Sequence, residues 1–352
     1  MQTFNVGILG ATGAVGQKFI RLLQNHPWFR IAALGASERS AGKPYREAAN
    51  WIESLEIPDE IGKMTVTECK PAAMGGVDFV FSGLDASVAT EIEQSFAEAG
   101  IPVISNAKNF RTHPDVPLLV PEVNPDHIEL IRRQTFSTNA TGFIVTNPNC
   151  VCVPLVMALR PLYDRFGIDS VIMTSMQSIS GAGYPGVASL DILGNVVPFI
   201  GGEEEKIMSE PMKLLGSKQA DGSVKHADFP IQATAVRVPV IDGHLLSVAV
   251  KFSERPAKFS DVKEAILTWK NPLAAMNLPF SPEFALKLYD DPRFPQPGRH
   301  AAAGNGMQVS VGRLREGNVF DVSFMALGHN TIRGAAGGAI LNAELLVNEG
   351  YL

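Results

Sequence analysis

One cysteine near the middle of the chain has the sequence context of a nucleophile. Cys150 closes the run Asn147-Pro148-Asn149-Cys150, which follows the β-rich residues 143–146 and precedes an apolar stretch, 151–162, with helical spacing. This context predicts a strand-to-helix junction, where backbone N–H groups and the helix dipole favour negative charge. We expect the position to lower the thiol pKa, although most free cysteines are buried structural residues.

A histidine and an arginine flank a second candidate position. His244 follows Asp242-Gly243, at a break between two predicted strands, and Arg237 lies seven residues earlier. An imidazole with a pKa near 6.5 suits acid–base catalysis, and a guanidinium binds a carboxylate through paired hydrogen bonds. Either residue alone is more simply explained as a surface hydrogen-bonding group. Two of them beside one sharp turn favour a functional interpretation.

Two further segments carry polar side chains beside glycines. Glu203 and Lys206 belong to an acidic helix start after Gly201-Gly202, a charge pattern that the helix dipole also explains without any function. One acid is suited to an ammonium group and Lys206 to a phosphate or carboxylate. Gln177 ends a predicted strand before a loop containing Gly181 and Ala182. Such a loop either covers a nicotinamide or a substrate, or is an ordinary glycine-rich turn.

The first elements of the chain are those of a dinucleotide site. Residues 4–9 predict a buried strand, and the apolar spacing of Phe19, Leu22 and Leu23 predicts a helix. Between them lies a glycine-rich turn, where the backbone can approach a pyrophosphate at the helix N-terminus. The residues of this turn are Gly10, Ala11, Thr12, Gly13, Ala14, Val15 and Gly16.

The end of the second predicted strand, 31–34, indicates which dinucleotide is bound. Ser37, Arg39 and Ser40 are suited to donate hydrogen bonds to a 2′-phosphate, which favours NADP over NAD. Glu38 keeps NAD open, and a merely hydrophilic loop is the simpler alternative.

Further strands at 77–81 and 101–105, with a helix at 86–99 between them, predict a doubly wound parallel sheet. Ser82 and Gly83 then lie at its ligand-binding edge. After the next strand come Lys108, Asn109 and Arg111, which either bind phosphate or form an exposed loop.

After Cys150 the pattern changes to long strands joined by turns, which predicts a mixed or antiparallel sheet and a second domain. The final segment, 335–346, is helical and is expected to return to the first domain, beside the glycine-rich turn. The fold class is therefore α/β, a Rossmann-type domain followed by an α+β domain. We expect the first to comprise residues 1–149 and 330–352 and the second residues 150–329. The long strands are expected at 170–177, twice within 233–252, and in a hairpin of 308–313 with 319–326.

Bulk properties exclude several classes of protein. A length of 352 residues favours two domains, and the formal net charge of -6 gives no support for nucleic-acid binding. Three cysteines form neither a disulfide framework nor a zinc-binding pattern. No apolar run approaches the length of a membrane span. We therefore expect a cytoplasmic protein without a metal or a membrane partner.

The ordered motifs resemble those of the aspartate-semialdehyde dehydrogenase family, in the branch found in archaea and fungi. The resemblance spans nearly the whole chain, and the set is specific because its members come in the family's order. It rests on Gly10 to Gly13, Asn147 to Cys150, Gln177 to Gly186, Gly201 to Lys206, Arg237 to His244, and His329 to Gly334.

The resemblance implies an enzyme that uses NADPH to reduce L-aspartyl 4-phosphate, in the synthesis of lysine, methionine and threonine. It implies that Cys150 forms an acyl-thioester, that His244 is the acid–base residue and that Gln177 positions the intermediate. Backbone N–H groups at the helix start beyond Cys150 are expected to stabilise the oxyanion. It also implies a homodimer or a tetramer of dimers formed through the second domain. The implied ligands are Arg237 for the α-carboxylate, Glu203 for the amino group, Lys206, Arg111 and Asn109 for phosphate, and Gly181, Ala182 and Asn330 for the nicotinamide.

Other readings stay open. Val151-Cys152-Val153 departs from the small or hydroxyl residues that often follow the family's cysteine, so a malonyl-CoA reductase that uses the same cysteine is an alternative. An N-acetyl-glutamyl-phosphate reductase is disfavoured by Asn149, where that family has glycine. A non-catalytic NADP-binding protein is disfavoured because Cys150, Gln177, Arg237 and His244 occur together.

Overall fold

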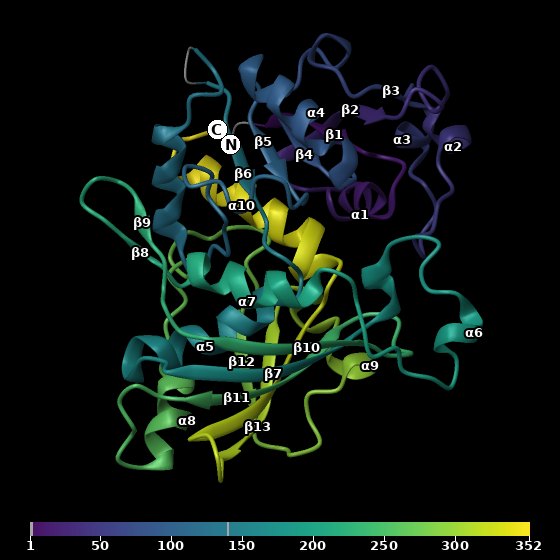
Figure 1. Ribbon diagram of the computed structural model, residues 1–352. Coiled ribbons are helices and arrows are strands. Elements are labelled where there is room, and N and C mark those ends of the chain that lie inside the picture. The colour runs from purple at the N-terminus through teal and green to yellow at the C-terminus, as the bar shows by residue number, and fades with distance from the viewer. Residues whose placement is uncertain (1–2, 139–140) are drawn as a thin grey trace.

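The computed structural model describes residues 3–138 and 141–352. It has two lobes, each built on a six-stranded sheet (Figure 1). The first sheet has the order β3-β2-β1-β4-β5-β6 and its pairs are all parallel, as the alternating pattern predicts. Its strands are β1 (Phe4–Leu9), β2 (Phe29–Ala36), β3 (Thr67–Glu68), β4 (Phe79–Ser82), β5 (Val103–Ser105) and β6 (Ile144–Thr146).

Helices cover this sheet because its strands are apolar on both faces. Phe19 of α1 (Ala14–Leu22) stacks on Phe81 of β4 with ring centroids 4.7 Å apart. Phe96 of α4 (Ala86–Glu98) is fully buried in a separate apolar cluster of the same lobe. Further helical segments of this lobe are α2 (Tyr45–Ala48), α3 (Asp59–Lys63) and 3-10 turns at Pro71–Ala73 and Pro125–Arg133.

The second sheet is mixed, with the order β10-β7-β11-β14-β13-β12. Strand β7 pairs parallel with β10 and antiparallel with β11, so the mixed sheet expected after Cys150 is confirmed. The strands are β7 (Ser170–Gln177), β10 (Ile231–Arg237), β11 (His244–Lys251), β12 (Leu286–Tyr289), β13 (Val309–Glu316) and β14 (Val322–Gly328). A separate two-stranded ribbon contains β8 (Ser217–Lys218) and β9 (Val224–Lys225).

One face of the second sheet packs on helices and the other stays partly open. Val171 and Met173 of β7 enter the core formed with α5 (Cys152–Phe166), while Ile172 between them is 41% exposed. This alternation follows from the two-residue period of a strand. The other helical segments of the lobe are α6 (Ser189–Ile192), α7 (Glu203–Leu214), α8 (Phe259–Leu267), α9 (Pro297–His300) and 3-10 turns at Ile179–Ala182 and Ala303–Gly306.

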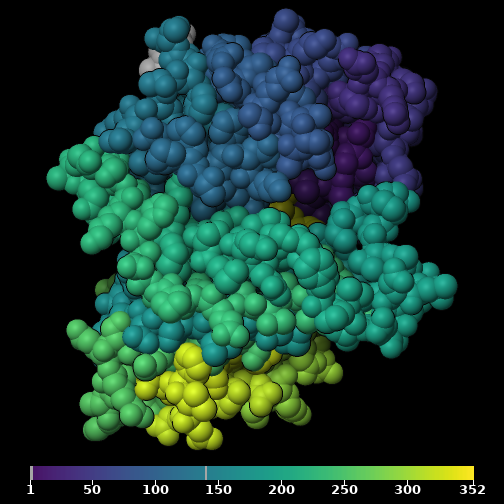
Figure 2. Space-filling view, in the orientation of Figure 1, coloured from purple at the N-terminus to yellow at the C-terminus, as the bar shows by residue number. Residues whose placement is uncertain are grey.

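The chain ends by returning to the first lobe, as predicted. After a single π-type turn, Ile332–Ala336, helix α10 (Gly337–Asn348) packs with β1 and α1 in one core that contains Ile8, Phe19 and Ile340 (Figure 1). In the space-filling view the two lobes meet along a waist where part of this yellow C-terminal segment is visible (Figure 2). In the described part of the chain, no helix has both the length and the apolar character needed to cross a membrane.

Candidate active site

Cys150 lies where β6 ends and α5 begins, the strand-to-helix junction predicted for it. Its Sγ is 3.2 Å from Nε2 of His244, which is fully buried at the start of β11. The two residues are far apart in sequence and meet because the second sheet carries His244 to the seam between the lobes. A thiol and an imidazole at this distance are the core of a nucleophilic site.

Strand order explains why three predicted residues share one edge of the second sheet. Gln177 and Arg237 are register partners at the ends of the parallel strands β7 and β10. Strand β11 runs the opposite way, so His244 at its start reaches the same edge. The sheet therefore assembles a hydrogen-bonding, a cationic and an acid–base group beside Cys150.

The electrostatic environment contradicts the expected low thiol pKa. Burial, followed by the negative charge of Glu203, raises the pKa of the Cys150 thiol to about 12. Burial, followed by the positive charges of Arg237 and His329, lowers the pKa of His244 to about 3. The cost of removing a charge from water outweighs the helix dipole here, because desolvation disfavours both the Cys150 thiolate and the His244 imidazolium. The resting pair is therefore a neutral thiol beside a neutral imidazole.

The backbone at the helix start also differs from expectation. The N–H of Val151 donates to Oδ1 of Asn149 at 2.8 Å, and the N–H of Cys152 donates to the Asn149 carbonyl at 2.9 Å. These two donors are therefore not free for an oxyanion, and that expectation is wrong for them. Within residues 3–138 and 141–352, the N–H of Cys150 itself has no hydrogen-bond partner. It is therefore a donor of this turn that remains available.

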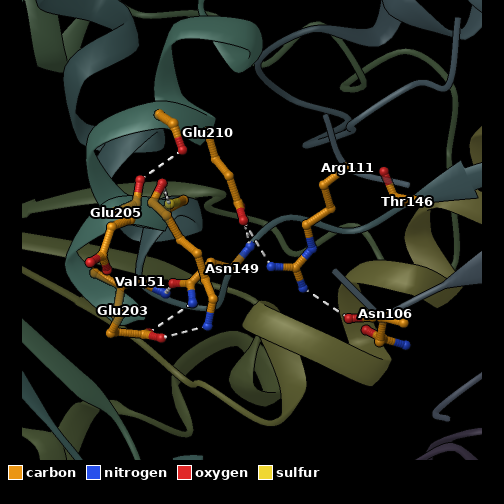
Figure 3. A network of polar contacts seen from close by, with 12 residues as sticks. Asn106, Arg111, Thr146, Asn149, Val151, Glu203, Glu205 and Glu210 are labelled. Atoms are coloured by element: carbon orange, nitrogen blue, oxygen red, sulfur yellow. Dashed lines mark hydrogen bonds and ion pairs between the residues drawn. The ribbon is translucent and has the colours of Figure 1, made fainter. Parts of the chain in front are cut away.

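Glu203 forms the centre of a polar cluster that includes Asn149 (Figure 3). The carboxylate is 6% exposed and accepts from Asn149 Nδ2 at 2.7 Å and from Gln177 Nε2 at 3.2 Å. It also pairs with Nζ of Lys206 at 3.1 Å, three residues on along α7. The predicted residues Glu203, Lys206 and Gln177 are thus in direct contact.

Arg111 is held by a residue that the sequence did not single out. Its Nη1 donates to Oε1 of Glu210 at 2.9 Å, and its Nη2 donates to the Asn106 carbonyl at 2.8 Å (Figure 3). The other oxygen of Glu210 accepts the N–H of Asn149 at 2.5 Å. One carboxylate of α7 therefore holds both a candidate phosphate ligand and the residue that precedes Cys150. Lys213 extends this contact surface by donating to three carbonyls of the 111–116 loop.

Arg237 and Gly181 meet over the imidazole. Nη1 of Arg237 donates to the Ser178 carbonyl at 2.8 Å, and the arginine is 7% exposed. A Cβ at Gly181 would lie 2.9 Å from that Nη1 and 3.0 Å from Cε1 of His244. Only glycine fits there without displacing either side chain, which explains the glycine in this loop. Ala182 ends the same 3-10 turn.

Gly334 lies directly against Cys150. A Cβ at this position would be 2.6 Å from Cβ of Cys150. The segment from His329 to Gly334, one of the motifs on which the resemblance rests, thus forms one wall of the site.

The glycine-rich turn has the geometry of a dinucleotide cradle. Gly10 has a φ of +73°, which side chains rarely adopt, and a Cβ at Gly16 would lie 2.3 Å from the Gly10 carbonyl. A Cβ at Gly83 would lie 3.1 Å from Val15, so the β4 loop packs tightly on the turn. Around these glycines Ala11 is buried, Gly13 is exposed, and Thr12, Ala14 and Val15 are partly exposed.

Ser37 and Arg39 are exposed at the end of β2, and Ser40 is partly exposed. A cavity of about 400 Å³ lies between the lobes, with Ala14 and Lys18 on one side and residues 183–187 on the other. The first-lobe edge therefore has exposed donors and an adjoining cleft, as a dinucleotide site requires.

Three other predicted residues have contacts that leave less for a ligand. The Ser82 hydroxyl is buried and donates to Glu93 at 2.6 Å. Nδ2 of Asn109 donates to the Ala86 carbonyl and to Thr90 of α4. Both polar atoms of the Asn330 amide are bonded within the protein, to Ser178, Ser180 and the N–H of Gly243.

Residues 5–131 match the model described as semialdehyde dehydrogenase, NAD binding domain, and residues 159–333 match its dimerisation domain. Aspartate-semialdehyde dehydrogenase of Schizosaccharomyces pombe is 49% identical and covers 99% of both chains. That of Archaeoglobus fulgidus is 48% identical and covers 98% of both. The chain belongs to the aspartate-semialdehyde dehydrogenase family.

Solved structures agree with the family and with the fold. The Candida albicans enzyme, solved with NADP, superposes with a TM-score of 0.91 at 42% identity and covers 100% of both chains. An aspartate-semialdehyde dehydrogenase from Vibrio cholerae, complexed with ASA, gives a TM-score of 0.77 at 29% identity over 99% of both chains. The resemblance and the fold class predicted from the sequence are thereby confirmed.

Proposed function

We propose that the protein reduces L-aspartyl 4-phosphate to L-aspartate 4-semialdehyde with NADPH, through an acyl-thioester on Cys150. The observation that carries this proposal is the contact between Cys150 and His244 within a ring of fixed charges. Glu203 raises the pKa of the thiol, whereas Arg111, Arg237 and Lys206 lower it, so all four charges act on the sulfur. One anionic and three cationic groups complement a substrate that carries one ammonium group, one carboxylate and one phosphate.

The charges divide among the substrate groups by their chemistry. Arg237 binds the α-carboxylate, because a guanidinium matches two carboxylate oxygens. Glu203 binds the ammonium group, and Lys206 and Arg111 bind the phosphate. Asn109 adds a further hydrogen bond to the phosphate once its side chain no longer bonds α4. A malonyl-CoA substrate has no amino group for Glu203, which favours the aminoacyl phosphate.

Proton transfer accompanies the attack because the resting pair is neutral. As Sγ of Cys150 bonds to the acyl carbon, the thiol proton passes to Nε2 of His244 and then to the departing phosphate oxygen. The C–O bond to phosphate breaks, and hydrogen phosphate leaves. The N–H of Cys150 stabilises the oxyanion, and Gln177 orients the thioester. When the C–S bond breaks in the second half-reaction, the sulfur regains a proton through His244 from solvent.

The cofactor that we assign to the first-lobe edge is NADP. The cradle fits because the positions around Gly10 and Gly16 have no room for a Cβ, and Ser37, Arg39 and Ser40 have the donors that a 2′-phosphate requires. Gly181 and Ala182 border the nicotinamide side. When bound, the reduced nicotinamide supplies the hydride that converts the thioester to the aldehyde.

The match to a dimerisation domain indicates a homo-oligomer. We assign its interface to the open face of the second sheet, where Ile172 is exposed, and we infer a dimer or a dimer of dimers. Ile172→Asp should shift the sedimentation coefficient to that of a monomer, and an unchanged value would remove this face from the interface. We place the enzyme in the cytoplasm, where its free cysteines stay reduced. Residues 1–149 with 330–352 form its cofactor domain, and residues 150–329 form its catalytic domain.

Substrate choice is tested by following NADPH oxidation with aspartyl phosphate, N-acetyl-glutamyl phosphate and malonyl-CoA as alternatives. We expect efficient turnover with the first alone. A preference for malonyl-CoA would contradict the assignment of aspartyl phosphate as the substrate.

A further inference from the structure

The Nδ1 side of His244 is where the structure adds something to the reaction. For Nε2 to accept the thiol proton, the ring must carry its other proton on Nδ1, and that proton needs an acceptor. Nδ1 lies 3.2 Å from Oγ of Ser178 and 3.1 Å from the N–H of the same residue. The two contacts have opposite effects. The backbone N–H favours an unprotonated Nδ1, whereas the hydroxyl oxygen is able to accept a hydrogen bond from a protonated Nδ1.

The direction of the Ser178 hydroxyl is fixed by Asn330. Oδ1 of Asn330 accepts the backbone N–H of Gly243 at 2.9 Å, and a backbone donor identifies that atom as the oxygen. Nδ2 of Asn330 donates to Ser180 at 2.8 Å. The Ser178 hydroxyl lies 3.0 Å from the same Oδ1 and donates to it. Its lone pairs are therefore left for Nδ1 of His244.

We propose that Ser178, oriented by Asn330, is a positioning residue that accepts the Nδ1 proton of His244 and so leaves Nε2 free to take the proton of Cys150. This inference deepens the proposed thioester mechanism and rests on it. Ser178 contacts neither the sulfur nor the reacting carbon in this arrangement. It acts through the imidazole, as the third member of a Cys–His–Ser relay.

The groups around the ring explain why this acceptor matters. Arg237 of β10 and His329 after β14 both disfavour an imidazolium, and Cys150 faces the other nitrogen. Gly181 of the 3-10 turn adds no charge. Among the described residues, no carboxylate contacts Nδ1. The backbone N–H of Ser178 donates to Nδ1 when that atom is unprotonated, and the Ser178 hydroxyl oxygen is the acceptor within reach when the ring carries a proton there.

The test is the rate at which iodoacetamide alkylates Cys150 in the substrate-free enzyme, followed by mass spectrometry of its peptide across pH 6 to 9. This readout needs neither aspartyl phosphate nor NADPH, so it is independent of the substrate assignment. Ser178→Ala should slow alkylation near pH 7 by roughly 10- to 100-fold, because a hydrogen bond from a charged group is lost. Asn330→Ala should slow it in the same direction, since the freed hydroxyl then donates to Nδ1.

Asn330→Asp separates this role from a purely structural one. A carboxylate in place of the amide still accepts the Ser178 hydroxyl and adds negative charge beside the ring, so alkylation near pH 7 should be faster than in the parent protein. Ser310→Ala is the matched control, because it removes an equally buried hydroxyl of the same sheet that bonds Gln308. Its alkylation profile should match that of the parent protein.

The outcomes separate clearly. Slower alkylation in Ser178→Ala and Asn330→Ala, with faster alkylation in Asn330→Asp, supports the relay. Parent-like profiles in folded Ser178→Ala and Asn330→Ala would overturn it. If Ser178→Ala fails to fold, the opposite shifts of the two Asn330 variants decide the matter, and shifts in the same direction refute the proposal. A failed substrate assay with these shifts intact would overturn the proposed function alone.

Discussion

The two sheets contribute to the site in different ways. The parallel sheet offers mainly backbone, through a contiguous turn in which a Cβ at Gly10 or Gly16 would collide with neighbouring backbone atoms. The mixed sheet offers side chains such as Gln177, Arg237 and His244, which are buried. On the first edge Ser37 and Arg39 are exposed, whereas on the second edge the polar groups are bonded to one another.

The effect of a substitution should therefore spread differently at the two edges. At an exposed edge each side chain acts nearly independently, so a change there affects ligand binding and little else. In a closed buried network, removal of one partner leaves another charge or hydrogen-bonding group unpaired. We therefore expect large effects at the second edge and small ones at the first.

The largest effect should come from the nucleophile. Cys150→Ser should lower kcat by at least about 10³-fold, because a serine hydroxyl beside a weakly basic imidazole is a poor nucleophile. Binding of NADPH, measured by fluorescence titration, should not change. Cys152→Ala is the matched control: that cysteine is fully buried in α5 and should be dispensable for turnover. Comparable losses in both variants would contradict a specific role for Cys150.

A large loss of stability is expected from a residue that does not touch the sulfur. Glu210→Ala removes the partner of buried Arg111 and of the Asn149 N–H, and should lower the free energy of unfolding by about 3 kcal/mol or more. Urea denaturation measures this change. Glu205→Ala on the exposed face of the same helix should stay within about 0.5 kcal/mol of the parent. Equal stability of the two variants would remove Glu210 from the network.

Glu93 is a buried carboxyl group beneath the edge of the first sheet. Burial raises the pKa of Glu93 to about 7, against the Ser105 and Ser82 hydroxyls, which lower it. The native state holds this proton up to higher pH than the unfolded chain. The contribution of protonated Glu93 to the free energy of unfolding is therefore fully present below pH 4.5. It is lost as the pH rises through 7, and the loss amounts to at most about 3 kcal/mol.

Glu93→Gln should remove that part of the pH dependence of stability. Urea denaturation at pH 5 and pH 8 measures the difference between the variant and the parent. An identical pH dependence in both proteins would show that Glu93 does not titrate in this window.

The smallest effect is predicted at the exposed edge. Arg39→Ala should raise the KM for NADPH by roughly tenfold and leave kcat and the KM for NADH nearly unchanged, because the guanidinium acts on the 2′-phosphate alone. Steady-state kinetics with both cofactors tests this. An equal rise in both KM values would place Arg39 against a part that the two cofactors share.

What could be predicted from the sequence follows the same division. The glycine-rich turn and the junction at Cys150 are local, so periodicity and turn chemistry place them without knowledge of the fold. The raised pKa of Cys150 depends on burial by distant segments, which no local pattern reports. Ser178 has no sequence signal beyond its place after Gln177.

The sequence around Glu210 carries a helical pattern of charges. Glu203, Lys206, Glu210 and Lys213 follow spacings of three and four residues, so they share one face of α7. A helix face of alternating charges usually faces solvent, and only the tertiary structure shows that three of these residues are buried.

The central claim is that Cys150 carries the acyl group. It is tested most directly by mixing the enzyme with aspartyl phosphate in the absence of NADPH and analysing the quenched protein by mass spectrometry. We predict an aspartyl adduct on the peptide that contains Cys150, released by hydroxylamine and lost when NADPH is added. Turnover without an adduct, or an adduct on Cys69 or Cys152 instead, would contradict the account.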